Sequence, residues 1–447
     1  MLIIGGGISG LSAAYYLAKA GVSSTLIEKR PRLGGVIQTE RVDGCLVEGG
    51  PDSFLAVKPW ALDLIRELGL ESEVIGSNDH LRKTFIRRNG RMIVMPDGLQ
   101  FLVPTRIAPI FTTPLLSWPT KARMALECFR HPPASQRPDC SVSDFVADHY
   151  GQETVDYLAE PLLAGVYGGA PESLSVASVL PRFVDLETKY GSLSRGMLAE
   201  KKRAAAGPSQ PIFRTLKSGL GSLVEAIRKS TERRVTIVHG EAEALERMAG
   251  GYRVRVAGEW IESGRVTLAC ESHGAAPLTR TIDQELSDIL AMVEYSSSTV
   301  IALGFDPGSF SRPPEGFGFL VPRRERRRLV ACTFMHTKFP LRAPEKKVFL
   351  RCFLAGAEDE PAVLPAVLEE LREMIGLTGP PLFSRVYRWP RSMAQYTVGH
   401  QGRVKAIEGR LKQHPGLFLA GNAYHGIGIP DCIRMGKQVA ERIHSPS

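Results

Sequence analysis

The chain has 447 residues, and its 56 Lys and Arg against 47 Asp and Glu give a formal net charge of +9. With 43% hydrophobic and 23% charged residues, the composition is that of an ordinary globular protein, which excludes a disordered chain, a collagen and a small disulfide scaffold. At roughly 150 residues per domain, the length fits about three domains or a few interleaved ones.

Membrane insertion and disulfide bonding are not indicated. No stretch approaches the ~20 uninterrupted apolar residues of a spanning helix, and no basic segment precedes the apolar start. The seven cysteines are scattered and never spaced as C-x-x-C, which is typical of reduced thiols. We expect a cytoplasmic protein without a metal site. The basic excess fits an acidic substrate or an anionic membrane surface better than nucleic acid, because no aromatic platform accompanies it.

The N-terminal segment predicts a strand, a glycine turn, a helix and a second strand. Met1 to Ile4 is apolar, glycines follow at once, and small and apolar residues then recur at helical spacing. A second apolar run from Ser24 to Ile27 ends at Glu28. This order predicts the opening of a parallel βαβ unit.

The middle of the chain predicts helices and then strands. Residues 132–139 and 204–211 are rich in Pro and polar residues and predict surface loops or boundaries, with a mainly helical segment between them. From Arg234 the runs VTIVHG, YRVRVAG and RVTLAC predict antiparallel strands of a meander. Further strands are expected at 298–305, 316–322, 329–334 and 347–356.

The C-terminal segment predicts a buried strand at 416–421, a glycine-rich turn, and a helix over 429–443. We expect both ends of the chain to form one doubly wound α/β layer of the Rossmann type, with the middle inserted into it.

The glycine turn has the spacing of a dinucleotide-binding motif. Gly5 allows a tight turn, Gly7 lets a pyrophosphate approach the backbone, and Gly10 allows close helix packing. The helix N-terminus favours phosphate, and Glu28 suits a ribose hydroxyl. Two further small-residue segments, Gly34-Gly35 and Gly49 to Pro51, together with the C-terminal turn, favour FAD over NAD.

The sequence resembles the flavin amine-oxidase-like superfamily and, within it, the protoporphyrinogen and coproporphyrinogen oxidases. The resemblance covers almost the whole chain and is carried by Arg82-Lys-x-Phe-Ile and by the blocks at 160–193, 316–322, 339–344 and 388–400. It implies a split two-dinucleotide-binding FAD domain, a mixed-sheet substrate domain and a helical, membrane-binding-like domain. The family usually has residues ahead of the first strand, so a shortened start is implied here.

The implied boundaries are 1–75, 205–275 and 397–447 for the FAD domain and 76–86, 176–204 and 276–396 for the substrate domain. The helical domain would span 87–175. Its segment from Pro104 to Arg130 mixes apolar residues with Arg and Lys, which fits either an interfacial face or an ordinary core-facing helix pair.

The resemblance also implies site residues. Substrate contacts would come from Arg82 as a propionate anchor and from Gly165, Leu320, Thr333 and Phe353, although Thr333 replaces a leucine of the plant mitochondrial type. FAD contacts would come from Gly5, Gly6, Gly7, Ile8, Ser9, Gly10, Glu28, Lys29, Arg32, Gly34, Gly35, Val36, Gly50, Pro51, Asp52, Ser53, Glu243, Asn422, Ile427, Gly428 and Ile429.

Several further residues have open or structural interpretations. Lys83, Arg182, Lys189 and Arg195 are additional candidate cations, whereas the run Arg323, Arg324, Arg326, Arg327 and Arg328 predicts a solvated loop. His400 and His425 are expected to be structural, and no catalytic acid or base is assigned. The segment after Val266 departs from the family pattern near the flavin.

The implied activity is an oxygen-dependent oxidation of protoporphyrinogen IX to protoporphyrin IX, with hydride transfer to FAD and release of H2O2. Coproporphyrinogen III is the alternative substrate. Another flavin amine oxidase, a desaturase, or a porphyrin-binding protein without turnover are more distant alternatives. Dioxygen, a membrane surface on the inner face of the cell membrane and a second copy of the chain are the partners that the resemblance allows.

Overall fold

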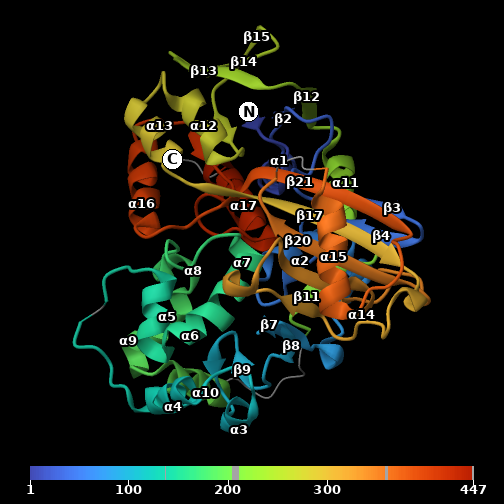
Figure 1. Ribbon diagram of the computed structural model, residues 1–447. Helices are drawn as coiled ribbons and strands as arrows, with labels where there is room; N and C mark the ends of the chain where they lie inside the picture. Colours follow the sequence, from blue (N-terminus) through green and yellow to red (C-terminus); the bar gives the residue numbers. More distant parts are fainter. Residues whose placement is uncertain (136, 204–210, 358–360, 445–447) are drawn as a thin grey trace.

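The computed structural model describes residues 1–135, 137–203, 211–357 and 361–444 (Figure 1). Apart from Pro211, the expected loop at 204–211 lies outside these residues, as does one position of the expected loop at 132–139.

A five-stranded parallel sheet forms the first layer. Its order is β12-β2-β1-β16-β22, and every neighbouring pair is parallel. The strands are β1 (Leu2–Ile4), β2 (Ser24–Glu28), β12 (Val235–His239), β16 (Val266–Leu268) and β22 (Leu417–Leu419). This arrangement confirms the predicted doubly wound layer.

The two ends of the chain meet in this layer. Helix α1 (Ile8–Lys19) packs directly on α17 (Ile429–His444), and a Cβ added at Gly436 would lie 2.4 Å from the carbonyl oxygen of Ser9 (Figure 1). Only a glycine allows this approach, so the first and last helices of the chain lie directly against each other.

The predicted meander is wrong for two of its three runs. The runs VTIVHG and RVTLAC contain β12 and β16, which pair in parallel with β2 and β1. The separate antiparallel sheet is formed by β13 (Ala242–Met248), β14 (Gly251–Val256) and β15 (Glu259–Ser263). Short apolar runs do not reveal pairing direction, and here the helix α11 (Gly221–Thr231) before β12 supplies the crossover that a parallel strand needs.

A seven-stranded mixed sheet forms the second layer. Its order is β21-β17-β20-β19-β18-β7-β8. The strands are β7 (Thr84–Arg88), β8 (Arg91–Val94), β17 (Tyr295–Phe305), β18 (Gly318–Leu320), β19 (Leu329–Phe334), β20 (Val348–Ala355) and β21 (Phe383–Ala394). Strands β17 to β20 were predicted, whereas β21 was not, because Pro390 and several arginines obscure its alternation.

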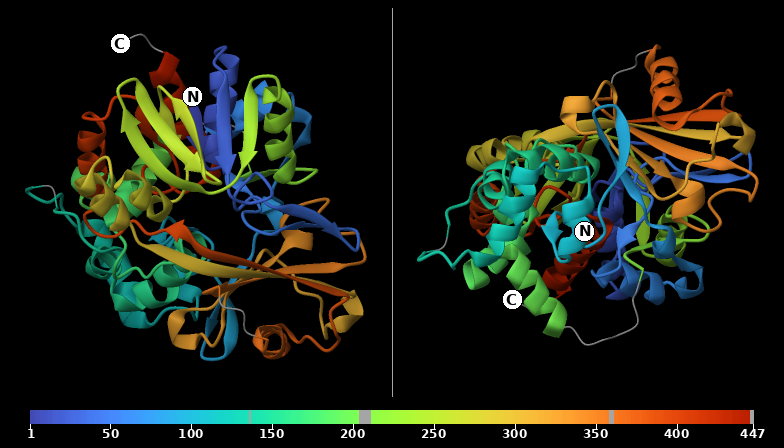
Figure 2. Two further views of the ribbon diagram at one scale, coloured as in Figure 1. Left: turned by 90° about the horizontal axis from the view of Figure 1, so that it is seen from above. Right: turned by 60° about the horizontal axis from the view of Figure 1, so that its bottom comes forward.

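The two faces of this sheet differ. Ile301, Cys332 and Cys352 point to one face and share a core with α15 (Val363–Ile375), which covers the sheet from outside (Figure 2). On the other face the indole N–H of Trp389 donates to the carbonyl oxygen of Gly49 at 2.8 Å. The inner face therefore meets the segment that follows β4 (Cys45–Glu48).

Helices gather at one end of the molecule, as predicted (Figures 1 and 2). They include α3 (Ile107–Thr112), α4 (Trp118–Leu126), α5 (Val142–Tyr150), α7 (Glu160–Tyr167), α9 (Pro181–Tyr190) and α10 (Leu193–Arg203). Among the described residues, none of the helices has both the length and the apolar character required to cross a bilayer.

The structure shifts several implied domain boundaries. The boundary at 86/87 falls inside β7, and β8 continues the same sheet. The boundary at 275/276 falls inside α12 (Ser272–Thr279). The segment 176–203 packs with the helical domain, since Ser192 donates to Glu127 and Arg195 donates to the carbonyl oxygen of Arg130. Each segment is assigned to the domain whose strand or helix it continues or contacts. Matching of family motifs does not show this continuity.

Candidate flavin and porphyrinogen site

The glycine turn joins β1 to α1 with almost no spare room on its protein side. Gly5 has φ +109°, and a Cβ at Gly10 would lie 2.0 Å from the carbonyl oxygen of Gly5. Gly7 is different, because a Cβ there would meet no protein atom within 4 Å. Gly7 is also the N-cap of α1, and no side chain caps the helix. The amides of the first turn, from Ile8 to Gly10, therefore have no side-chain cap.

Glu28 lies at the end of β2 beside this turn. Its carboxylate accepts the N–H of Gly6 at 2.6 Å and the N–H of Arg30 at 2.8 Å, and it is 7% exposed. A carboxylate has about four lone-pair positions, so two acceptor positions remain for hydroxyl groups. Two backbone N–H groups thus hold Glu28 in an orientation suited to a ribose.

Two further segments close over the glycine turn. The N–H of Gly34 donates to the carbonyl oxygen of Gly6 at 2.8 Å, and Arg32 fixes the next residues by donating to the carbonyl oxygen of Gly35 at 2.7 Å. A Cβ at Gly50 would lie 2.0 Å from the carbonyl oxygen of Val36. The structure therefore brings the Gly34 to Val36 segment and Gly50 together beside the turn.

Asp52 anchors the Gly50 to Ser53 segment to the substrate sheet. Its carboxylate lies 2.9 Å from Nη1 of Arg351 in β20 and 3.1 Å from Nζ of Lys338 in α14 (Met335–Lys338). Burial alone would raise the pKa of Asp52, but the two cations outweigh burial and hold this pKa well below its usual range. Sequence reasoning missed Lys338 and Arg351, although an arginine inside the apolar run VFLRCF was a usable signal.

The C-terminal turn contains the last of the segments that were predicted to contact FAD. The side-chain amide of Asn422 donates to the carbonyl oxygen of Ser392 at 2.9 Å, and Tyr396 donates to the carbonyl oxygen of Asn422 at 2.8 Å. Ile427 and Gly428 lead into α17, which begins at Ile429. Asp431 in the first turn of α17 accepts from Lys58 at 2.6 Å, so this helix start is fixed to the segment that follows Ser53.

Lys29 directly follows β2, and Glu243 lies near the start of β13, the strand after β12. The β13 ladder is irregular between Ala242 and Ala244, so the backbone of Glu243 stands out of the regular pairing. Its side chain instead pairs with Arg255 at 2.9 Å. The implied FAD contact through the Glu243 backbone stays a prediction. Lys29 is exposed and lies 4.0 Å from Glu241.

These observations fit FAD. The space above Gly7 and the uncapped start of α1 suit a pyrophosphate, and the free acceptor positions of Glu28 suit a ribose. The start of α17 supplies a second positive dipole end.

The inner face of the seven-stranded sheet carries the predicted substrate residues. Leu320 pairs with Ala331, and Ala331 pairs with Phe353, so all three side chains point to one side. Thr333 lies on the same side, two residues along β19 from Ala331. Gly165 in α7 faces this row, because a Cβ there would lie 4.0 Å from Cδ2 of Leu320.

Arg82 lies just before β7, which pairs in parallel with β18, the strand that ends at Leu320. The Arg82 side chain is exposed and has no hydrogen-bond or ion-pair partner among the residues that the structure describes. Lys83 is exposed beside it. An unpaired guanidinium at the edge of the substrate sheet is suited to a carboxylate ligand.

The other candidate cations are engaged elsewhere. Arg182 pairs with Glu200 at 2.6 Å, and Lys189 lies 5.3 Å from the ring centre of Tyr190. Arg195 donates to main-chain oxygens of the helical domain. The structure does not bring these three to the row of substrate residues.

The arginine run 323–328 is solvated at Arg323, Arg324 and Arg327, as predicted, but not at Arg326, which is only 17% exposed. Arg323 pairs with Glu172, Arg324 with Asp156 and Arg326 with Glu160. Arg327 pairs with Glu373, and the N–H of Arg328 donates to Glu370. The run therefore links the substrate sheet to the helical domain and to α15. Sequence reasoning missed these pairs because the acidic partners are far away along the chain.

The predicted structural histidines are placed accordingly. His400 stacks on Tyr396 with ring centres 3.8 Å apart, and burial lowers the pKa of His400 to about 4. His425 pairs with Glu408 at 2.9 Å on the surface. Each of the two rings therefore contacts another side chain of the protein.

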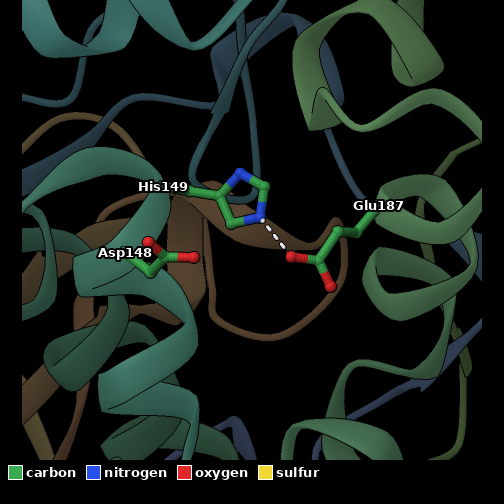
Figure 3. A group of neighbouring side chains, drawn as sticks. All are labelled: Asp148, His149 and Glu187. Atoms are coloured by element: carbon green, nitrogen blue, oxygen red, sulfur yellow. Dashed lines mark hydrogen bonds and ion pairs between the residues drawn. The ribbon is translucent and has the colours of Figure 1, made fainter. Parts of the chain in front are cut away.

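One group in the helical domain brings three potential metal ligands together. Ligand atoms of Asp148, His149 and Glu187 all lie within 4.8 Å of one another (Figure 3). Arg137 bridges the two carboxylates, and His149 contacts Glu127 at 3.0 Å and Glu187 at 3.2 Å. Because a guanidinium and a fourth side chain already contact these ligand atoms, the group is a partly buried network of hydrogen bonds and ion pairs.

The chain was compared with known proteins. The family model described as flavin containing amine oxidoreductase matches residues 8–444. A Bacillus subtilis (strain 168) protein named coproporphyrinogen III oxidase is 36% identical, with 98% of this chain and 96% of that protein covered. Protoporphyrinogen oxidase 2 of Arabidopsis thaliana is 24% identical, with 99% and 93% covered.

A solved structure is also similar to this chain over nearly its whole length. A protein from Exiguobacterium sp. 255-15 with the provisional name protoporphyrinogen oxidase has a TM-score of 0.88, with 32% identity, and the match covers 99% of this chain and 98% of that one. The chain belongs to the flavin-containing amine oxidoreductase family. Within this family it is an FAD-dependent oxidoreductase of the porphyrinogen oxidase group, which confirms the predicted fold, cofactor and enzyme class.

Proposed function

We propose that this enzyme oxidises coproporphyrinogen III to coproporphyrin III. The observation that carries the proposal is the 36% identity, over nearly all of both chains, to a protein named coproporphyrinogen III oxidase. The Arabidopsis thaliana relative named protoporphyrinogen oxidase is 24% identical, and the Exiguobacterium protein with that provisional name is 32% identical. The similarity therefore favours the alternative substrate of the sequence analysis over protoporphyrinogen IX, which was its main interpretation.

FAD, when bound, supplies the two-electron oxidation chemistry. The role of the chain is to place a meso carbon of the macrocycle against it. Leu320 and Phe353 offer apolar surface on the sheet, and Gly165 supplies a backbone face without a side chain. Arg82 binds a propionate at the edge of the sheet. A porphyrinogen gains aromaticity on oxidation, so the pyrrole protons leave without an assigned base.

We also propose that dioxygen is the electron acceptor, so that the enzyme acts on CH–CH donors with oxygen as acceptor and releases H2O2. The test is to mix the purified holoenzyme with coproporphyrinogen III and follow porphyrin fluorescence and oxygen consumption together. The proposal expects three O2 consumed for each porphyrin formed, because the oxidation removes six electrons in two-electron steps. Fluorescence gain no faster than without enzyme contradicts it. Turnover of simple amines instead assigns the chain to the amine oxidases.

A second proposal concerns the helical domain, which presents an apolar stripe. Trp118, Ala122 and Leu126 follow one another at helical spacing on α4, all exposed, and Phe129 extends the stripe at 71% exposure. Arg123 lies beside them. We propose that this stripe contacts an anionic membrane surface. Flotation with vesicles containing phosphatidylglycerol should recover the wild-type enzyme and lose the variant Trp118→Ser with Leu126→Ser. Equal flotation of both contradicts it.

A further inference from the structure

We propose that the buried ion pair between Glu160 and Arg326 sets the separation between α7 and β18, and thereby the position of Gly165 relative to Leu320. Glu160 and Arg326 would then be positioning residues for porphyrinogen binding, with no contact to the substrate. The inference rests on the proposed function in one respect, namely that the macrocycle binds at the Gly165 and Leu320 faces.

Both carboxylate oxygens of Glu160 accept hydrogen bonds from the turn that follows β18. Its Oε1 lies 2.8 Å from Nη2 of Arg326, and its Oε2 accepts the backbone N–H of Arg323 at 3.0 Å. The Glu160 and Arg326 side chains are 6% and 17% exposed. A charge-assisted pair that is shielded from water on both sides is held in one geometry more tightly than a surface pair.

Arg326 ties this carboxylate to the end of β18. The same Nη2 atom that reaches Glu160 donates to the carbonyl oxygen of Val321 at 3.0 Å, and Nε donates to it at 3.3 Å. Val321 is the residue that follows Leu320. One planar guanidinium therefore connects the first residue of α7 to the backbone next to Leu320.

The helix transmits this constraint to the substrate face. Glu160 is the first residue of α7, and Gly165 lies five residues further along the same helix. Because a helix is rigid over this length, fixing its start against the turn after β18 fixes the position of Gly165 relative to Leu320. In this arrangement a Cβ at Gly165 would lie 4.0 Å from Cδ2 of Leu320.

The neighbouring pairs of the arginine run provide a contrast. Arg323 and Glu172 are 52% and 53% exposed, and their side chains lie 3.2 Å apart. Exposed pairs of this kind contribute only about 0–1 kcal/mol and hold no fixed geometry. Glu172→Gln is therefore a matched control, since it removes a carboxylate that pairs with the same arginine run but lies outside α7 and β18.

The test uses the FAD-loaded enzyme and compares Glu160→Gln with Glu172→Gln. Loss of the carboxylate in Glu160→Gln releases the start of α7, and a Gly165 that is no longer held in place relative to Leu320 weakens substrate and transition-state binding alike. We expect KM for coproporphyrinogen III to rise about tenfold, which corresponds to ~1.4 kcal/mol, while kcat stays within about twofold. Glu172→Gln should keep the wild-type KM. The Kd of coproporphyrin III, measured by tryptophan quenching, should rise with KM.

Arg326→Lys is a second and milder variant. A lysine keeps the charge near Glu160 but has no planar fork with which to bond Val321 at the same time, so its KM should fall between wild type and Glu160→Gln. This variant keeps the test decisive if Glu160→Gln does not fold.

Two results would overturn the inference. The first is a KM for Glu160→Gln, or for Arg326→Lys if only that variant folds, equal to that of Glu172→Gln. The second is a lower melting temperature with unchanged KM and unchanged Kd, which is the signature of a purely structural pair. Failure of the proposed function is separate, because the wild-type enzyme itself would then not oxidise coproporphyrinogen III.

Discussion

Arg351 and Asp52 are 299 residues apart in the chain, yet Nη1 of Arg351 lies 2.9 Å from the carboxylate of Asp52 in the interior of the molecule. Arg351 is 1% exposed, and Lys338 binds the same carboxylate. The pair joins the Gly50 to Ser53 segment to β20 of the substrate sheet. It thus connects the proposed flavin site with the proposed porphyrinogen site.

Removing this arginine should destabilise the enzyme and its cofactor site together. In Arg351→Met, Asp52 keeps Lys338 but loses its buried partner, and breaking a buried pair costs about 3–5 kcal/mol. We expect a lower free energy of unfolding in urea and weaker retention of FAD on gel filtration. Arg385→Met on the exposed part of β21 is the control and should change neither. If Arg351→Met has the same free energy of unfolding as wild type, the pair does not stabilise the fold.

Two glycines of one motif should respond differently to the same substitution. A Cβ at Gly10 would lie 2.0 Å from a backbone oxygen, so Gly10→Ala should destabilise even the apoprotein, by about 1–3 kcal/mol or more. A Cβ at Gly7 meets no protein atom, so Gly7→Ala should leave the apoprotein stable and weaken FAD binding about tenfold or more. Melting curves of both apoproteins and FAD titrations would separate the two effects. If Gly7→Ala binds FAD normally, the pyrophosphate does not lie above Gly7.

Arg82 should matter for substrate and not for folding. Since it is exposed and has no partner within the described ranges, Arg82→Met should change the free energy of unfolding by less than about 0.5 kcal/mol. Loss of a charged hydrogen bond to a propionate should raise KM for coproporphyrinogen III about tenfold or more. Arg91→Met, an exposed arginine on β8, serves as the comparison. Equal KM values for the two variants would remove Arg82 from the site.

The helical domain should lose stability in acid because of Glu127. Burial alone would raise the pKa of Glu127, but hydrogen bonds from His149, Leu193 and Ser192 outweigh burial and lower this pKa. A folded-state pKa below the unfolded value adds stability that is present above about pH 4.5 and is lost as the pH falls through the folded value.

The measurement is the free energy of urea unfolding between about pH 7 and pH 4, and wild type should fall toward the acid end. Glu127→Gln should be less stable at neutral pH and show a flatter profile. Glu241→Gln, whose side chain is 73% exposed in the native protein, should follow wild type. A Glu127→Gln profile as steep as that of wild type would contradict the assigned role.

The sequence was informative where the signal is local. The strand, turn and helix around Gly5 to Gly10 follow from adjacent residues, and the structure has them as predicted. The pairing direction of β12 and β16 did not follow, because an apolar run of a few residues fits a parallel or an antiparallel neighbour equally well.

Long-range electrostatic contacts were the main omission. Arg326 was assigned to solvent because its partner Glu160 is 166 residues away, and Lys338 and Arg351 were missed because Asp52 is 286 and 299 residues away. No periodicity or spacing encodes such pairs. They become visible only when the domains are assembled, and in this protein they are the contacts that join one domain to the next.

The choice of substrate is tested most directly by competition. Equal concentrations of coproporphyrinogen III and protoporphyrinogen IX are mixed with the FAD-loaded enzyme in air, and the early porphyrin products are separated and counted. Their ratio equals the ratio of the two kcat/KM values. We expect coproporphyrin III to lead by about tenfold or more, which corresponds to ~1.4 kcal/mol of transition-state binding. A lead for protoporphyrin IX would contradict it.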